Sequence, residues 1–478
     1  TFAAVVTNGA PESVRLTGDR AAFLGRGGTP ARPAAVAGGG PLDGRTGAGL
    51  DACAAQQVTV TIDPGSTVEL SFLFGEAEDE SGARALIERY GTPEALARSF
   101  AESRASWTDV FSRLQIETPS KSLDLMVNGW LPYQTIACRI RARTAFYQSG
   151  GAFGFRDQLQ DATSLTILAP EIARAQILLH AAHQFVEGDV LHWWHPPDSR
   201  GIRTRFADDL LWLPGLTAHY IRTAGDRAIL DENIRFIAAR PLEAGEDEAF
   251  LAPSDSGTSG DLFEHCLRAL DRSLKVGAHG LPLFGTGDWN DGMNRVGREG
   301  RGESAWMGFF LHHVLGEFLD VCGFRLDALR RERYIAHRAA LAAALNEGGW
   351  DGDWYRRGYY DDGTPLGSKE SDECRIDALA QSWAVISGVA SPERARAVMD
   401  EVEARLISRE DGIIRLLTPP FENSAHDPGY IKGYVPGVRE NGGQYTHAAL
   451  WVVQAMAELG RHDQVGALLD MLNPITRT

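Results

Sequence analysis

Cysteine is scarce in this sequence. The 478 residues include only five cysteines, which are scattered along the chain, and no two of them form a CxxC pair. An odd number of scattered thiols argues against a disulfide framework, and reduced thiols are typical of a cytoplasmic protein. We therefore expect a cytoplasmic location and no disulfides.

Long apolar runs are also lacking. No uninterrupted run approaches the roughly 18 apolar residues that a membrane helix needs, and the first residues do not form a secretory signal. We therefore expect no membrane segment in this chain. The chain opens on Thr1 rather than on methionine, so we expect a fragment, and a parent protein associated with the inner membrane stays open.

Basic residues are outnumbered by acidic ones. Lys and Arg total 47 against 64 Asp and Glu, which leaves a formal net charge of −17. Such a charge argues against nucleic acid and anionic membrane surfaces as partners. An anionic ligand such as phosphate would need a local cluster of hydrogen-bond donors.

The first part of the chain differs in composition from the rest. It is rich in Gly, Ala and Pro, and residues 57–62 and 67–73 alternate apolar and polar side chains. Alternation with a period of two predicts half-buried strands. We interpret residues 1–80 as the C-terminal part of a β-sandwich domain. Residues 81–118 have a helical pattern, and we interpret them as a helical linker.

From residue 119 onwards the chain is predicted to be helical. Amphipathic segments recur with helical spacing, and most loops between them are alternately long and short. Helices that run up and down with this asymmetry bring the long loops to one end, where function is usually located. The predicted helices are 121–141, 157–169, 171–187, 206–225, 259–275, 303–322, 328–347, 375–388, 391–408, 443–459 and 462–473.

These features predict an α+β multidomain chain whose residues 119–478 form a toroid of helical hairpins with the long loops at one end. A closed ring of six hairpins needs twelve helices, whereas the periodicity predicts about eleven. We therefore expect an incomplete barrel, with the twelfth helix beyond Thr478.

The long loops share a composition that suits sugars. Residues 142–156, 188–205, 276–302, 348–374 and 409–442 are dense in Trp, Tyr, Gly, Asn, Asp, Arg and His. The apolar faces of sugars stack on aromatic rings, and sugar hydroxyls bond to carboxylate, amide and guanidinium groups. The loops therefore predict a carbohydrate site.

Asp291 is the candidate general acid. Breaking a glycosidic bond needs a proton donor, because an alkoxide is a poor leaving group. Asp291 lies in a short Gly-flanked loop beside Trp289. The alternative is that Asp-Trp-Asn-Asp forms only a capping turn. Gly442 and Gly443 precede a predicted helix and could expose its amides to an anion, although glycines are also common in plain turns.

Other residues permit more than one interpretation. His192 and His195 could form half of a metal site, but no partner pair with ligand spacing stands out, and we expect no metal. His180 and His183 fall on a predicted helix and are typical of core or surface positions. The aromatic loop at 350–360 is equally consistent with packing and with ligand contact.

Four motifs together resemble glycoside hydrolase family 94, the inverting phosphorylases. They are 154–158 (Gly-Phe-Arg-Asp-Gln), 287–292 (Gly-Asp-Trp-Asn-Asp-Gly), 381–384 (Gln-Ser-Trp-Ala) and 436–443 (Pro-Gly-Val-Arg-Glu-Asn-Gly-Gly). The resemblance runs over nearly the whole chain. Segments 148–153, 192–197 and 363–368 are most similar to the phosphorylase-like domain of cyclic β-1,2-glucan synthases.

The resemblance implies a fold and a set of roles. The fold is a β-sandwich, a helical linker, an (α/α)6 barrel and a C-terminal β-domain, before which this chain is expected to be truncated. Asp291 is implied as the general acid. Phosphate is expected at His447, Gly442 and Gly443. The residues expected to bind the sugar substrate are Arg156, Asp157, Gln158, Trp289, Arg439 and Glu440.

Two departures from the family pattern concern phosphate. Cellobiose-type members carry a phosphate-holding arginine at the position that aligns with Gly151. A Thr-Gly pair that contacts phosphate in the family is expected beyond the end of this chain.

The function that the resemblance implies is inverting phosphorolysis of β-glucosidic bonds. β-1,2-Gluco-oligosaccharides are the favoured substrates, and α-glucose 1-phosphate is the expected product. Inorganic phosphate is then a co-substrate, and no cofactor is expected. An inverting hydrolase with Glu440 as base and a non-catalytic glucan-binding module of a cyclic glucan synthase stay open as alternatives. A homodimer and a domain of a larger synthase are both compatible with the sequence.

Overall fold

The computed structural model describes residues 1–8, 11–143 and 150–477. Gln148 and Ser149, which belong to one of the motifs quoted above, lie outside the described residues, as does Thr478. The chain divides into two compact units, Thr1–Asp109 and Val110–Thr478. Each unit is described by itself below. The predicted domain boundaries at residues 80 and 118 stay predictions.

The first unit contains two antiparallel strand pairs and short helices. Strand β1 (Phe2–Thr7) pairs with β4 (Leu70–Gly75), and β2 (Ser13–Asp19) pairs with β3 (Ala52–Thr59). The alternating segments 57–62 and 67–73 each overlap one strand. The helices of this part of the chain are α1 (Arg20–Leu24), α2 (Ala34–Ala37), α3 (Glu80–Tyr90) and α4 (Pro93–Ser112).

The second unit is rich in helices, and every predicted helical segment contains one. The first is a continuous stretch made of α5 (Lys121–Leu125), η1 (Met126–Trp130), α6 (Leu131–Tyr133) and η2 (Gln134–Ala142), in which η1 and η2 are π-helical. The others are α7 (Phe155–Leu168), α8 (Pro170–Ala181), α9 (Trp212–Ala224), α10 (Leu262–Ser273), α11 (Ala305–Phe324), α12 (Ala328–Glu347), α13 (Ala378–Ile386), α14 (Pro392–Arg405), α15 (Thr446–Glu458) and α16 (His462–Leu472).

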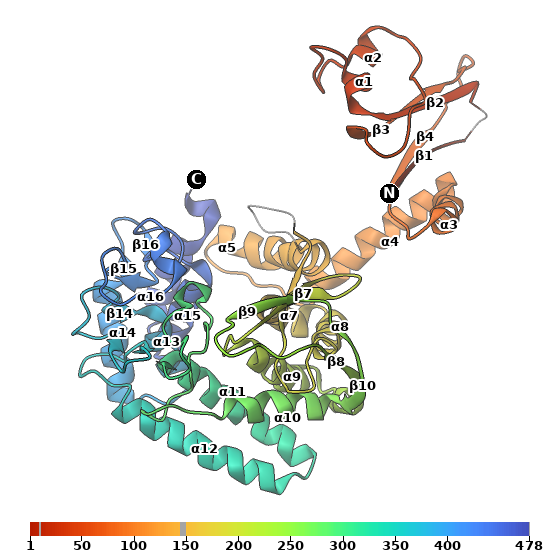
Figure 1. Cartoon of the computed structure of the whole chain (residues 1–478). Helices are drawn as coiled ribbons and strands as arrows, with labels where there is room; N and C mark the ends of the chain where they lie inside the picture. The colour runs from red at the N-terminus through yellow and green to blue at the C-terminus, as the bar shows by residue number, and fades with distance from the viewer. Residues whose placement is uncertain (9–10, 144–149, 478) are drawn as a thin grey trace. The chain divides into compact units, whose positions relative to one another are not determined.

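The helices of the second unit form two sets. Helices α7, α9, α11, α13 and α15 pack each against the next, and the helices between them in sequence pack against this row. The row is the more buried set: in α13 all residues but Ile386 are buried, whereas α12 buries only Tyr334, Leu341 and Leu345. Figure 1 shows α12 at the edge of the unit alongside α11. The apolar core therefore lies along the inner row.

Most predicted helices differ from the structure by three residues or fewer at each end, whereas two differ by six residues at one end. The segment 171–187 was expected to be one helix, but α8 ends at Ala181. After it the chain turns back, because the Phe185 amide donates to the Asp189 carbonyl and the Gln184 side chain donates to the Gly188 and His265 carbonyls. The helix expected from residue 206 begins only at Trp212, after a 3-10 turn at Asp209–Leu211 (η3).

Several segments expected as loops contain short strands. A four-stranded antiparallel sheet is formed by β5 (Phe153–Gly154), β6 (Leu191–His195), β7 (Arg200–Thr204) and β9 (Glu248–Leu251), and β8 (Asn233–Ala238) pairs with β10 (Ser254–Asp261). The remaining strands are two residues each: β11 (Glu303–Ser304), β12 (Gly358–Tyr359), β13 (Pro365–Leu366), β14 (Ile376–Asp377), β15 (Ile407–Ser408), β16 (Ile413–Ile414) and β17 (Leu417–Thr418). Of these, β11, β14 and β15 lie at the ends of segments that were predicted to be helical. Pairing between strands therefore holds the long connections in place. None of the helices in the described part of the chain is both long enough and apolar enough to span a bilayer.

The inner packing generates a stability prediction. Phe318 of α11 is fully buried, and its ring stacks on Phe263 of α10 at a centroid distance of 6.0 Å. We expect Phe318→Ala to lower the free energy of unfolding of the second unit by about 3–5 kcal/mol, since it leaves a cavity. Urea unfolding followed by tryptophan fluorescence reports this unit, because all tryptophans except Trp107 lie in it.

The matched control for that prediction is Leu329→Ala. Leu329 is 79% exposed on α12, so its truncation should change the free energy of unfolding by less than about 0.5 kcal/mol. Equal losses for both variants would contradict the described core.

Candidate active site

The N-terminal ends of the inner helices bring polar side chains from distant parts of the chain together. Arg156 is the second residue of α7, Asp208 directly precedes η3 and α9, and Ser304 and Asp377 cap α11 and α13. His447 is the second residue of α15. All of these helix ends follow long connections, as the alternation of loop lengths predicted.

Arg156 is the hub of this cluster. Its side chain is 7% exposed, and its Nη1 donates to both oxygens of Asp208, at 3.2 and 3.1 Å, and to the Asp288 carbonyl at 3.2 Å. Its Nη2 donates to Asp291 Oδ1 at 2.6 Å. Burial alone would lower the pKa of Arg156, but the charges of Asp208 and Asp291 outweigh it and raise that pKa. The guanidinium therefore stays charged and fixes one oxygen of Asp291.

The two aspartates of the Asp-Trp-Asn-Asp motif differ in their surroundings. Asp288 is fully buried and accepts hydrogen bonds from Arg357 Nη2 at 2.6 Å and from Ser304 Oγ at 2.8 Å. Asp291 opens the 3-10 turn η5 (Asp291–Met293), and its side chain is 32% exposed. The buried Asp288 therefore anchors the loop to the protein interior, while the carboxyl of Asp291 is partly exposed to solvent.

His192 of β6 lies next to Asp291. Its Nδ1 is 2.8 Å from Asp209 Oδ2, and its Nε2 is 3.9 Å from Asp291 Oδ2. The imidazole stacks on the Phe206 ring at 4.5 Å, and Phe206 in turn lies so close to Gly287 that a Cβ there would come within 1.8 Å of the ring. Burial would lower the pKa of His192, but the Asp209 and Asp291 carboxylates outweigh it and raise that pKa to about 9.

Three aromatic rings lie around Trp289, which belongs to the same loop as Asp291. Trp289 is 7% exposed, and its ring centroid lies 5.2 Å from Tyr445, 5.2 Å from Trp451 and 5.6 Å from His447. Burial lowers the pKa of His447 to about 4, so this imidazole is neutral near pH 7. Its Nε2 is 3.0 Å from the side-chain nitrogen of Gln160. If the Gln160 amide donates, the imidazole proton is on Nδ1.

The segment before α15 carries Glu440. The Glu440 side chain is 11% exposed, and Arg439 Nε lies 3.5 Å from its Oε2, which has no hydrogen-bond partner among the residues that the structure describes. The buried Asn441 fixes the segment by donating to the Phe421 and Tyr434 carbonyls. Burial, with the charges of Glu440, Asp157 and Asp291, raises the pKa of Tyr445 to about 12.

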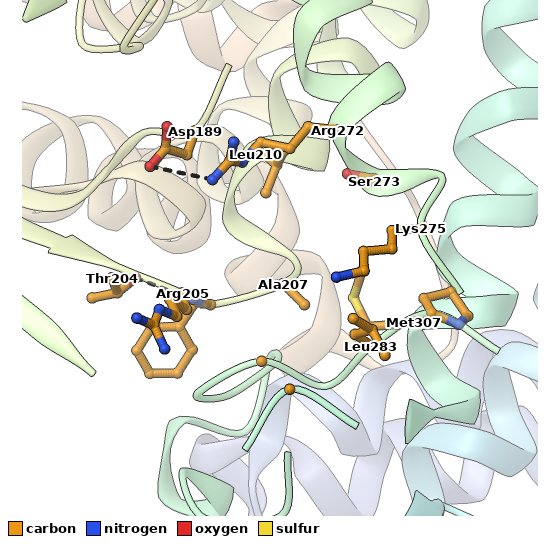
Figure 2. A pocket seen from close by; sticks show the side chains of 14 residues that line it. Asp189, Thr204, Arg205, Ala207, Leu210, Arg272, Ser273, Lys275, Leu283 and Met307 are labelled. Carbon is orange, nitrogen blue, oxygen red and sulfur yellow. Dashed lines mark hydrogen bonds and ion pairs between the residues drawn. The ribbon is translucent and has the colours of Figure 1, made fainter. Parts of the chain in front are cut away.

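A cavity of about 470 Å³ lies beside this cluster rather than at it. It is lined by Phe206, the ring that supports His192, and by Arg205, Arg272 and Lys275, but by neither Asp291 nor Arg156. Figure 2 shows Arg272 turned toward Asp189, at an ion-pair distance of 3.7 Å. The chemistry of the side chains, and not this cavity, therefore locates the candidate active site.

The sequence matches two family descriptions. Residues 106–478 match the glycosyl hydrolase 94 superfamily, catalytic domain, and residues 1–93 match the glycosyl hydrolase 94 supersandwich domain. The chain belongs to the glycosyl hydrolase 94 superfamily. This membership confirms the predicted family and a multidomain organisation in which a supersandwich domain precedes a helix-rich catalytic domain.

Relatives of this glycosyl hydrolase 94 chain include synthases and phosphorylases. The chain is 48% identical over 461 residues to the cyclic beta-(1,2)-glucan synthase NdvB of Rhizobium meliloti, covering 96% of this chain and 16% of the relative. It is 30% identical to the solabiose phosphorylase of Paenibacillus borealis, covering 95% of this chain and 56% of the relative. A more distant relative, at 22% identity, is the 1,2-beta-oligoglucan phosphorylase of Listeria innocua, with 78% and 34% covered. The chain thus spans only part of the length of each relative.

The structure brings several of the predicted site residues of this family member together. Arg156 contacts Asp291, Asp157 lies at the surface with its Oδ1 3.9 Å from Arg156 Nε, and Trp289 contacts His447. Charges on Asp291 and Glu440 both act on Tyr445. The roles assigned to these residues stay predictions.

Three predicted contact residues form hydrogen bonds within the protein. The Gln158 amide accepts from the Gly154 nitrogen at 2.6 Å and donates to the Arg139 carbonyl at 3.3 Å, and the residue is 2% exposed. The Gly442 nitrogen donates to the Glu440 carbonyl, and Gly443 accepts from the Leu416 nitrogen through its carbonyl. These bonds explain how the motifs hold their shape, and the proposed ligand contacts of these residues stay predictions.

Of the residues that hold Asp291 and its loop, sequence reasoning assigned a role to Arg156 but none to Asp208 or Arg357. Asp208 and Asp209 fall at the start of the predicted helix 206–225, and nothing in the sequence shows their partners. Arg357 lies in the aromatic loop, and its partner Asp288 is 69 positions away in sequence. No pattern of neighbouring residues in the sequence predicts such a pair. The Trp354 ring, in the same loop, is buried, and its Nε1 donates to the Gly367 and Arg375 carbonyls. Lys369 Nζ and the Arg405 guanidinium lie 5.7 and 5.0 Å from the ring centroid, so the described contacts of this ring are with the protein itself.

The buried Arg357 generates the prediction for this site. Arg357→Met would leave Asp288 as a buried charge without its cation, so we expect the free energy of unfolding to fall by about 3–5 kcal/mol. The control is Arg409→Ala, which breaks an exposed pair with Glu403 and should cost less than about 1 kcal/mol. Urea unfolding followed by tryptophan fluorescence measures both, and a loss below about 1 kcal/mol for Arg357→Met would contradict the anchoring role of Asp288.

Proposed function

We propose that this chain is the catalytic part of an inverting glycoside phosphorylase whose inner and outer helices belong to an (α/α)6 barrel. The proposal rests on the exposure of the Asp291 carboxyl and on the contacts that orient it. Its carboxyl is partly exposed, and one of its oxygens is fixed by a buried arginine that is itself held by the buried Asp208. A general acid needs such a placement, with one oxygen oriented by the protein and the other free for the proton.

In the proposed reaction Asp291 donates its proton to the departing glycosidic oxygen. Phosphate attacks C1 from the opposite face of the sugar, so a β-glucoside gives α-glucose 1-phosphate. Phosphate is already an anion, and no second carboxylate has to activate it, whereas an inverting hydrolase needs a base for its water. Arg156, Asp157, Trp289 and Glu440, with Gln158 and Arg439 from the same motifs, are the proposed sugar-binding residues.

The proposed phosphate site includes His447 and the backbone around Gly442 and Gly443. A neutral imidazole whose Nε2 faces Gln160 keeps one N–H to donate. The N-terminus of α15 adds partial positive charge next to it. In a chain with a net charge of −17, such local donors are what would allow phosphate to bind. Phosphate is then a co-substrate, and the proposal needs no cofactor and no metal.

The names of the relatives support the choice of substrate. One acts in cyclic β-1,2-glucan synthesis, and another is a phosphorylase of β-1,2-oligoglucan. We therefore favour β-1,2-gluco-oligosaccharides as substrates. A cytoplasmic location and a place within a larger synthase or a homodimer belong to the same proposal.

A second candidate function is inverting hydrolysis. Glu440 favours hydrolysis, because its Oε2 has no hydrogen-bond partner among the described residues and a general base needs an oxygen that can accept a proton. To separate the two functions, the chain is incubated with β-1,2-gluco-oligosaccharides with and without inorganic phosphate, and glucose 1-phosphate and free reducing sugar are assayed. We expect glucose 1-phosphate, and only with phosphate. Free sugar without phosphate would show a hydrolase, and binding without any product would show a glucan-binding module; either would contradict the proposal.

Asp291→Asn provides the direct mutational prediction. The amide cannot donate a carboxylic proton, so we expect the rate of oligosaccharide phosphorolysis to fall by about 10²- to 10⁴-fold with the fold unchanged. The matched control is Asp400→Asn on α14, where the carboxylate is 67% exposed, and this variant should keep the wild-type rate. Wild-type turnover by a folded Asp291→Asn variant would show that Asp291 is not the general acid.

A further inference from the structure

His192 is held more firmly than a surface histidine would be. Asp209, which accepts from its Nδ1 at 2.8 Å, is 2% exposed and is the first residue of η3, the turn before α9. The Phe206 ring lies almost parallel to the imidazole, with an interplanar angle of 18° and a centroid distance of 4.5 Å. These two contacts fix both the tautomer and the ring plane, so the second ring nitrogen has a defined direction.

That second nitrogen faces the candidate acid. His192 Nε2 is 3.9 Å from Asp291 Oδ2, while the other carboxyl oxygen, Oδ1, is bonded to Arg156 Nη2. A distance of 3.9 Å is too long for a direct hydrogen bond, but one water or a small rotation of the carboxyl would close it. Oδ2 is therefore the oxygen that can exchange a proton with the imidazole.

The charges around His192 favour a proton on its ring. The carboxylates of Asp209, before α9, and Asp291, in η5, act on it from two elements, and Arg156 of α7 opposes them. Phe206 brings no charge. Asp208 is the partner of Arg156 and offsets much of that cation. The imidazole is thus a place where a proton can be stored within reach of Asp291.

We propose that His192 is a positioning residue that stores a proton and exchanges it with Oδ2 of Asp291, which keeps the general acid loaded. This inference rests on the proposed phosphorylase function. The proton on Nε2 passes to Oδ2, which leaves a neutral imidazole and a neutral carboxylic acid. Asp291 then protonates the glycosidic oxygen as the C1–O bond breaks and a phosphate oxygen bonds to C1. Nε2 regains a proton from solvent, and the phosphate ester releases its own proton to solvent.

The kinetic test compares His192→Gln with His195→Gln, a change in the same strand outside the cluster. The glutamine keeps a polar side chain but stores no proton. For His192→Gln we expect kcat on an unactivated β-glucoside to fall at least about tenfold, and the alkaline limb of the kcat–pH profile to move to lower pH. The KM for phosphate should change by less than about twofold. His195→Gln should leave all three unchanged. Wild-type kcat in His192→Gln, or a lower kcat with an unmoved alkaline limb, would overturn the proposal.

A second measurement does not depend on activity. The ring nitrogens of His192 are followed by NMR in histidine-labelled protein across pH, with His192→Gln used for assignment. We expect Asp291→Asn to lower the pKa of His192, because one of the two carboxylates that face it is gone. An unchanged titration would overturn the proposed exchange. If the titration moves but the wild-type chain makes no glucose 1-phosphate, the coupled pair is real and the phosphorylase function is what fails.

Discussion

The arrangement of the site depends on one buried guanidinium. Arg156 bonds Asp208, 52 positions away, and Asp291, 135 positions away, so it ties α7, the start of α9 and the η5 loop to one point. A buried cation costs several kcal/mol unless it is paired and hydrogen-bonded. Each of the three segments must therefore reach its place before the charge is compensated. The same requirement gives Asp291 its orientation, because its Oδ1 is one of the compensating atoms.

Because of a second buried ion pair, the two aspartates of one short motif have different roles. Asp288 bonds Arg357 and Ser304 in a region with no solvent access, and this fixes the loop at its base. Asp291, three positions later, has a partly exposed side chain and a histidine 3.9 Å from its second carboxyl oxygen. Proton transfer requires a loop that is rigidly held and a carboxyl that is partly exposed, since the acid must keep its orientation while it changes charge. The same loop therefore serves both stability and function.

The helices could be predicted from sequence, whereas the polar contacts could not. Segments such as 259–275 have a clear amphipathic repeat, which identifies a helix with little ambiguity. Strands of two residues, such as β11 and β12, have no period to detect, and α8 ended early because tertiary hydrogen bonds at Gln184 replaced helical ones. The motifs pointed to Asp291, Arg156 and Trp289. They could not show that His192 faces Asp291, because that depends on how β6 is placed by its pairing with β5 and β7.

In the proposed reaction, everything depends on whether Asp291 supplies a proton to the leaving group. The most direct test compares two donors in Asp291→Asn and in the wild type: a β-1,2-gluco-oligosaccharide, whose alcohol must be protonated, and β-glucosyl fluoride, whose fluoride leaves with little proton transfer. Phosphate-dependent turnover of both donors is measured. The account predicts that the loss on the oligosaccharide exceeds the loss on the fluoride by at least about 10²-fold. Equal losses on the two donors would contradict it, because they would show that Asp291 acts in binding or in folding and not as the acid.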